Sequence, residues 1–211
     1  MKHLLIIGAR GFGRQVYFIA LNSIGYKEQF DVKGYLDDKT DALDNFNHYP
    51  PICGSVEDYV IQEDDVFICA LGDVYYKKKY VDIILSKGGV FTNIIHKKSS
   101  IGINSSIGTG VIISDGVHIG CDSHIGNYNT FNVNAIVGHD CIIGDFCQLN
   151  CMSFMGGFSQ IGSFVTLQTS SIVLPHKKLG SNCSLGASSV VIRNFGDNVA
   201  LFGNPAKKIE Y

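Results

Sequence analysis

A six-residue repeat of apolar residues runs unbroken through the second half of this 211-residue chain. It occupies Ile95, Ile101, Ile107, Ile113, Ile119, Ile125, Phe131, Val137, Ile143, Leu149, Met155, Ile161, Leu167, Val173, Leu179, Leu185 and Val191. A period of six fits neither the 3.6-residue turn of an α-helix nor the two-residue alternation of a β-strand. It fits a prism whose short strands each turn one large side chain inward, with three strands to a coil of about eighteen residues.

The residues around each large position support the same architecture. Glycine follows many of them, as in Ile101-Gly102 and Ile119-Gly120, and we expect it to permit backbone angles that a β-branched residue resists. Four residues after each large position the side chain is usually small or β-branched, which suits the narrow corner of a prism. We therefore predict a parallel β-helix with coils about 4.8 Å apart. A chance run of isoleucines in a β-sandwich would not keep this phase.

The first ninety residues show a different pattern. Apolar runs at 2–7, 32–36 and 66–71 alternate with helix-like segments, which is typical of a small parallel α/β sheet. Ligands of such sheets bind beyond the carboxyl ends of the strands. The candidate substrate-binding residues at these three ends are Gly8, Arg10, Gly11, Phe12, Gly13, Asp37, Asp38, Gly72 and Asp73.

The glycine loop between residues 8 and 13 has the spacing G-x-x-G-x-G, which differs from the dinucleotide fingerprint G-x-G-x-x-G. A tight strand-to-helix turn without a ligand explains it equally well, and a solvated turn explains Asp37 and Asp38. If the loop binds a ligand, backbone N–H groups at the helix N-terminus favour phosphate. Ninety residues are too few for the full NAD-binding fold, so we expect one nucleotide-sized ligand.

Composition narrows the class of protein. A formal charge of −2 gives no reason to expect a nucleic-acid or membrane partner. No apolar run reaches the roughly 18 residues that span a bilayer, and the N-terminal apolar run is too short for a signal peptide. Seven cysteines without a Cys-x-x-Cys motif favour reduced, structural thiols, so we expect a cytoplasmic protein without a bound metal.

The two halves in this order resemble the sugar O-/N-acetyltransferases of the sialic acid O-acetyltransferase and bacillosamine N-acetyltransferase group. The resemblance is carried by the glycine loop, by Asp37-Asp38, by Gly72-Asp73 and by hexads that end in Gly203-Asn204-Pro205-Ala206-Lys207. It implies a small Rossmann-like α/β domain (1–90) that binds a nucleotide sugar. A left-handed parallel β-helix (91–197) and a C-terminal tail (198–211) would follow. It also implies a homotrimer with acetyl-CoA in the groove between neighbouring prisms.

The resemblance places the chemistry in the segment 132–146, where the family's catalytic histidine falls on His139. Imidazole can take the proton that an attacking amine or hydroxyl loses near neutral pH. A neighbouring carboxylate can orient the ring, a role that falls to Asp140. The family often has glutamate here, and the shorter side chain leaves the reach of Asp140 open. Asp145 belongs to the next face and is less suited. Without the resemblance, His139 would be taken for an exposed polar residue.

The resemblance also supplies the acetyl-CoA contacts. One coil beyond His139, the N–H of Gly157 faces the thioester carbonyl; the alternative for this glycine is a purely structural corner. Other coenzyme contacts fall on Gln148, Thr169 and Ala187.

His118 and His124 lie on adjacent faces, so they cannot chelate one metal within a subunit, although they could meet across an interface.

We therefore expect direct acetyl transfer from acetyl-CoA to the amine of a nucleotide-linked amino-dideoxy sugar, with His139 as general base. Two alternatives stay open. One is O-acetylation of a sialic-acid-type sugar, which needs no nucleotide pocket. The other is a non-enzymatic trimeric scaffold that binds sugar nucleotides.

Overall fold

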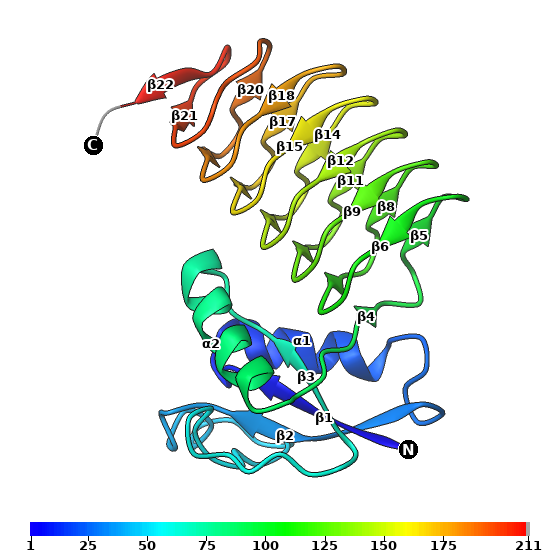
Figure 1. The fold of residues 1–211 in the computed structure, drawn as a ribbon, viewed down its shortest axis with the longest axis vertical. Coiled ribbons are helices and arrows are strands. Elements are labelled where there is room, and N and C mark those ends of the chain that lie inside the picture. The colour runs from blue at the N-terminus through cyan, green and yellow to red at the C-terminus, as the bar shows by residue number, and fades with distance from the viewer. Residues whose placement is uncertain (210–211) are drawn as a thin grey trace. The chain divides into compact units, whose positions relative to one another are not determined.

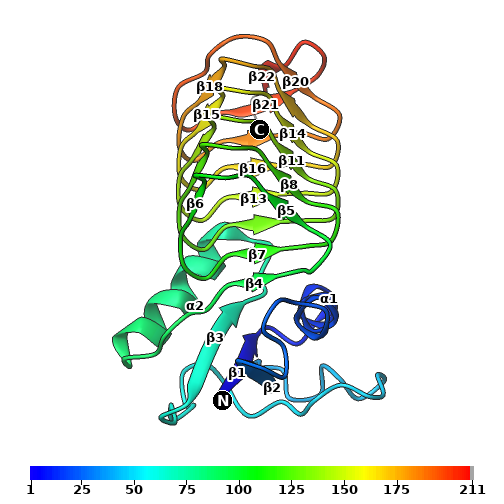
Figure 2. The ribbon, with the colours of Figure 1, turned by 90° about the vertical axis from the view of Figure 1, so that its right-hand side faces the viewer.

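The computed structural model describes residues 1–209, and the chain divides into two compact units. The first comprises Met1–Lys97 and the second begins at Lys98 (Figures 1 and 2). None of the helices within these described residues is long and apolar enough to cross a membrane.

The first unit is the predicted parallel α/β sheet. Its elements are β1 (Lys2–Ile7), α1 (Gly11–Leu21), β2 (Phe30–Leu36), β3 (Asp65–Cys69), α2 (Val74–Ser86) and β4 (Ile94–Ile95). The strands of the sheet lie in the order β2-β1-β3, and both pairs are parallel. Leu4, Leu5, Ile6 and Ile7 of β1 are all buried, which explains why this central strand reads as a continuous apolar run.

The second unit is a parallel β-helix with three walls. The first wall contains β5 (Ser100–Ile101), β8 (His118–Ile119), β11 (Ile136–Val137), β14 (Phe154–Met155), β17 (Ile172–Val173) and β20 (Val190–Val191). The second contains β6 (Ser106–Ile107), β9 (His124–Ile125), β12 (Ile142–Ile143), β15 (Gln160–Ile161) and β18 (Lys178–Leu179). The third contains β7 (Ile112–Ile113), β10 (Thr130–Phe131), β13 (Gln148–Leu149), β16 (Thr166–Leu167), β19 (Ser184–Leu185), β21 (Ala200–Phe202) and β22 (Lys207–Ile209).

The register of the walls follows the sequence repeat. Phe131 pairs with Leu149 in the next coil and Val137 pairs with Met155, an offset of eighteen residues in each case. These large side chains are fully buried inside the prism. The predicted fold class, an α/β domain followed by a left-handed parallel β-helix, is therefore confirmed. The segment expected to be a tail adds β21 and β22 to the third wall.

The predicted role of the glycines that follow the large residues, to permit unusual backbone angles, is wrong. The positive φ angles lie three residues after each large position, not at the glycine that follows it. At Gly102 and Gly120 a Cβ atom would lie 2.4 and 2.5 Å from a backbone nitrogen of the next coil. These glycines are needed because the coils approach closely, whereas the left-handed corner lies two positions later in the repeat, where Gly110 and Gly116 are glycines and the other residues are not. The corner positions are Asn104, Gly110, Gly116, Asp122, Tyr128, Asn134, Asp140, Phe146, Met152, Phe158, Phe164, Ser170, His176, Asn182 and Ser188.

Candidate active site

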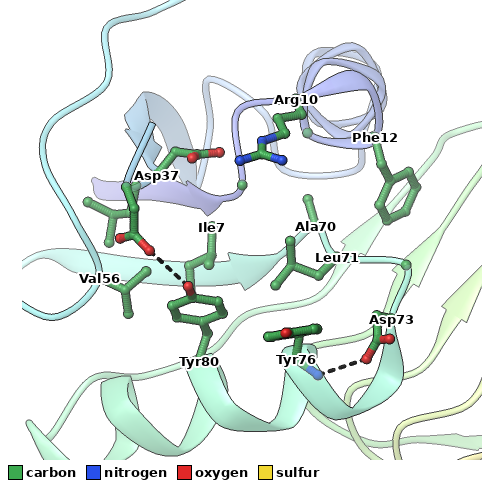
Figure 3. A pocket seen from close by; sticks show the side chains of 15 residues that line it. Ile7, Arg10, Phe12, Asp37, Val56, Ala70, Leu71, Asp73, Tyr76 and Tyr80 are labelled. Atoms are coloured by element: carbon green, nitrogen blue, oxygen red, sulfur yellow. Dashed lines mark hydrogen bonds between the residues drawn. The ribbon is translucent and has the colours of Figure 1, made fainter. Parts of the chain in front are cut away.

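A cavity of about 500 Å³ lies beyond the carboxyl ends of β1, β2 and β3 in the first unit (Figure 3). Every predicted substrate-binding residue except Gly11 lines it. The lining residues are Ile7, Gly8, Arg10, Phe12, Gly13, Leu36, Asp37, Asp38, Val56, Ala70, Leu71, Gly72, Asp73, Tyr76 and Tyr80. The structure thus brings the three glycine- and aspartate-bearing strand ends together.

The fold requires glycine at some positions of the glycine loop and not at others. A Cβ on Gly13 would lie 1.8 Å from the carbonyl oxygen of Gly8, and Gly8 itself has a φ of +96°. Local folding alone therefore requires both glycines. At Gly11, by contrast, no described heavy atom lies within 4 Å of a Cβ position. Arg10 precedes α1 and its side chain makes no capping hydrogen bond in the described part of the chain, so first-turn N–H groups of this helix are suited to an anion.

The two neighbouring aspartates have different partners. Both carboxylate oxygens of Asp37 accept backbone hydrogen bonds, from the N–H of Ala9 at 2.8 Å and from that of Lys39 at 2.9 Å. Asp37 therefore ties the glycine loop to the end of β2. Asp38 accepts one hydrogen bond from the Tyr80 hydroxyl, at 2.9 Å, and lines the cavity. Of the two, Asp38 has the carboxylate better able to accept a hydrogen bond from a ligand.

Helix α2 supplies one side of the cavity. Asp73 caps this helix by accepting the N–H groups of Tyr75 and Tyr76, so its carboxylate has a structural role. Tyr76 and Tyr80 lie one helical turn apart and face Arg10 and Phe12 across the cavity (Figure 3). Burial, and then the hydrogen bond to Asp38, raises the pKa of Tyr80 to about 12, so its hydroxyl stays a donor at neutral pH. Sequence reasoning missed both tyrosines, although their four-residue spacing after Gly72-Asp73 is a signal.

His139 occupies the corner at which the chain passes from the first wall to the second. Its Nδ1 lies 2.7 Å from Oδ2 of Asp140, so the shorter carboxylate does reach the ring. An ionised carboxylate can only accept, so a neutral ring in this contact donates through Nδ1–H and keeps the lone pair on Nε2. Asp145 lies at the next corner, where its Oδ1 accepts the backbone N–H of Asn127. Of the two carboxylates, Asp140 is the one paired with His139.

Gly157 lies directly beneath the imidazole. A Cβ on this residue would lie 2.7 Å from Nε2 of His139, so a side chain here would collide with the ring. The glycine is therefore required by the histidine itself, a reason that the sequence does not reveal.

The remaining predicted coenzyme contacts lie apart from His139 along a single chain. Thr169 and Ala187 are exposed at the corner between the third wall and the first, one coil apart. Gln148 is buried on the third wall; its Nε2 donates to Asn150, while its Oε1 has no hydrogen-bond partner among the described residues. One chain thus holds His139, Asp140 and Gly157 at one corner and Thr169 with Ala187 at another.

Within residues 1–209, no group of three or more His, Cys, Asp or Glu residues is placed to hold a metal ion. The Nδ1 atoms of His118 and His124 lie within hydrogen-bond distance of Ser100 and Ser106, respectively, on adjacent walls.

Two family models match different parts of the chain. A family model described as the PglD N-terminal domain matches residues 3–84, and one described as the GMPPB C-terminal domain matches residues 91–188. No curated protein sequence matches the chain.

Solved structures match over the whole chain. The acetyltransferase domain of PglB from Neisseria gonorrhoeae is 22% identical with a TM-score of 0.90, over 99% of this chain and 100% of that one. PerB from Caulobacter crescentus, solved with CoA and GDP-perosamine, is 27% identical with a TM-score of 0.87, over 100% and 98%. WeeI from Acinetobacter baumannii is 20% identical with a TM-score of 0.74, over 99% and 100%.

Proposed function

We propose that this chain, an acetyltransferase of the left-handed β-helix group by its fold and structural relatives, acetylates the amine of a nucleotide-linked amino sugar with acetyl-CoA. The observation that carries the proposal is the His139–Asp140 pair over Gly157, in a chain that matches PerB from end to end. That relative was solved with CoA and GDP-perosamine, and it also exists as variants in which a histidine is replaced by asparagine or alanine.

In the proposed reaction the amine nitrogen attacks the thioester carbonyl carbon while Nε2 of His139 takes the proton that the nitrogen loses. The new C–N bond forms, the C–S bond breaks, and the sulfur leaves as the thiol with the proton from His139. Asp140 stabilises the imidazolium through its hydrogen bond to Nδ1. We assign the N–H of Gly157 to the developing oxyanion, a role that typically contributes about 3 kcal/mol.

The cysteine two residues after His139 is not placed to act as a nucleophile. Cys141 is fully buried, and burial raises the pKa of its thiol. A buried thiol with a raised pKa is a poor nucleophile, because the thiolate is the reactive form. We therefore propose direct transfer, without an acetyl-enzyme intermediate on Cys141.

A homotrimer would complete the site. His139 lies at one edge of the first wall, and Thr169 and Ala187 lie at its other edge. If the first walls of three copies face a common threefold axis, the His139 edge of each copy meets the Thr169 edge of the next. Such a head-to-tail arrangement closes into a ring.

The outer surface of the first wall suits this arrangement. Four consecutive outward side chains, Ile136, Phe154, Ile172 and Val190, are stacked in register as one apolar column that follows the polar Ser100 and His118. Ile136 is exposed and the other three are half-buried. In the corresponding column of the second wall, Ile142 is followed by the polar residues Gln160 and Lys178. An apolar column of this kind is typical of a surface that another copy covers.

The proposal is tested by offering the protein acetyl-CoA and 4-amino-sugar nucleotides that carry GDP, UDP or dTDP. We expect release of free CoA thiol and a mass gain of one acetyl group on one of these substrates. The matching nucleoside diphosphate should also raise the melting temperature. If no nucleotide at millimolar concentration stabilises the protein, and free sialic acid is acetylated instead, the nucleotide-sugar assignment is wrong.

Replacing Asp38 by asparagine should weaken binding of that nucleoside diphosphate about tenfold. The substitution removes a charged acceptor, and charge-assisted hydrogen bonds are among the stronger ones. Isothermal titration calorimetry measures the change. Asp41→Asn is the matched control, because Asp41 pairs with Lys39 and does not line the cavity. Equal affinities of the two variants would remove Asp38 from the binding site.

A further inference from the structure

The imidazole of His139 lies in a slot built by its own corner of the β-helix. His139 and Gly157 occupy equivalent positions in successive coils, and so do Asp140, Phe158 and His176, whose φ angles are all near +60°. The N–H of Phe158 donates to the carbonyl of His139 at 3.0 Å, which locks the two coils together. Because Gly157 has no side chain, the ring rests over its backbone.

Phe158 lies against the imidazole in this slot. Its ring meets the imidazole of His139 edge to face, with centroids 5.1 Å apart and an interplanar angle of 89°. The phenyl ring is itself stacked on His176, at 4.9 Å and 5°. Asp140, Gly157 and Phe158 thus all lie against the His139 ring, and His176 stacks on the phenyl ring.

The hydrogen bond to Asp140 cannot fix the imidazole alone. The side chains of His139 and Asp140 are 61% and 40% exposed, and solvent competes for such a pair. One hydrogen bond also fixes Nδ1 but leaves the plane of the ring free to tilt. An aromatic contact on the ring restricts that tilt.

We propose that Phe158 is a positioning residue, which holds the plane of the His139 imidazole so that Nε2 faces the reacting amine. This inference rests on the proposed role of His139 as general base. Phe158 acts through His139 and takes no proton itself. Small displacements of a catalytic group have large kinetic effects, about 100-fold for roughly 1 Å.

The test is the pair Phe158→Leu and Phe158→Tyr. We expect Phe158→Leu to lower kcat by about 10- to 100-fold, with the KM for acetyl-CoA unchanged, whereas Phe158→Tyr keeps the ring and at least half of kcat. The NMR signals of the His139 ring, assigned by their loss in His139→Ala, should shift in Phe158→Leu and stay in place in Phe158→Tyr.

Phe164→Leu is the matched control. Phe164 has the same left-handed backbone conformation, with a φ of 59°, and its ring is stacked on Phe146 at 5.2 Å and 3°, but at a different corner. This variant should keep the kcat of the wild type. If Phe158→Leu stays within twofold of wild type while His139→Ala is inactive, the positioning role is overturned and the proposed function stands. If His139→Ala is itself fully active, both are wrong. Loss of activity in Phe158→Tyr to the level of Phe158→Leu would also overturn the positioning role.

Discussion

Replacing His139 by alanine should lower the turnover of amine acetylation at least about 100-fold, which is the usual size of a general-base contribution. The alanine leaves no group to take the proton at the attacking nitrogen. Acetyl-CoA binding should be largely kept, because the proposed role of the imidazole concerns the amine and not the coenzyme. A coupled assay of thiol release gives the turnover, and calorimetry gives the affinity for the coenzyme.

His124→Ala is the control for this substitution. His124 is also exposed on the β-helix, and its Nδ1 also has one polar partner, Ser106 at 2.9 Å. It lies on the second wall, away from the Gly157 slot. We expect wild-type turnover from this variant. A His139→Ala enzyme within a factor of two of wild type would refute the assignment of the base.

The sequence predicts the β-helix unusually well because each coil repeats one physical requirement. A large apolar residue must fill each wall, so the period of six is visible without any knowledge of long-range contacts. The repeat predicts that Ile119 and Phe131 lie inside the prism, and both are fully buried. The strand ends that line the cavity could be predicted for a similar reason, since parallel strands bring their carboxyl ends to one edge.

Contacts between residues far apart in the sequence could not be predicted in the same way. The repeat shows that Gly102 recurs, but only the stacked coils show that its Cβ would strike the backbone at Cys121. Likewise, the Asp-Asp pair after β2 predicts two carboxylates at the strand end. It does not predict that Asp37 accepts the N–H of Ala9 while Asp38 accepts the hydroxyl of Tyr80. These contacts depend on which distant residues the tertiary structure brings together.

Introducing a charge on the first wall should separate the copies and abolish activity. Ile172→Glu places a carboxylate in the apolar column, where association would bury it without a partner. We expect a monomer by light scattering and at least about a 100-fold loss of turnover, although His139 is untouched, because the coenzyme groove would need two copies. Gln160→Glu, at the equivalent outward position of the second wall, should keep the oligomeric state and the activity of the wild type.

A mixing experiment tests whether the proposed trimer forms its active sites between neighbouring copies. His139→Ala chains keep the Thr169 edge, and Thr169→Arg chains, which we expect to be inactive, keep His139. Hybrid trimers refolded from both variants contain boundaries at which an intact His139 meets an intact Thr169. We expect activity to reappear only in the mixture, at up to about a third of the wild-type sites per hybrid, since each closed ring of three copies has three boundaries. No recovery in hybrids confirmed by native mass spectrometry would mean that each chain binds the coenzyme alone, and the proposed arrangement of the walls would have to be abandoned.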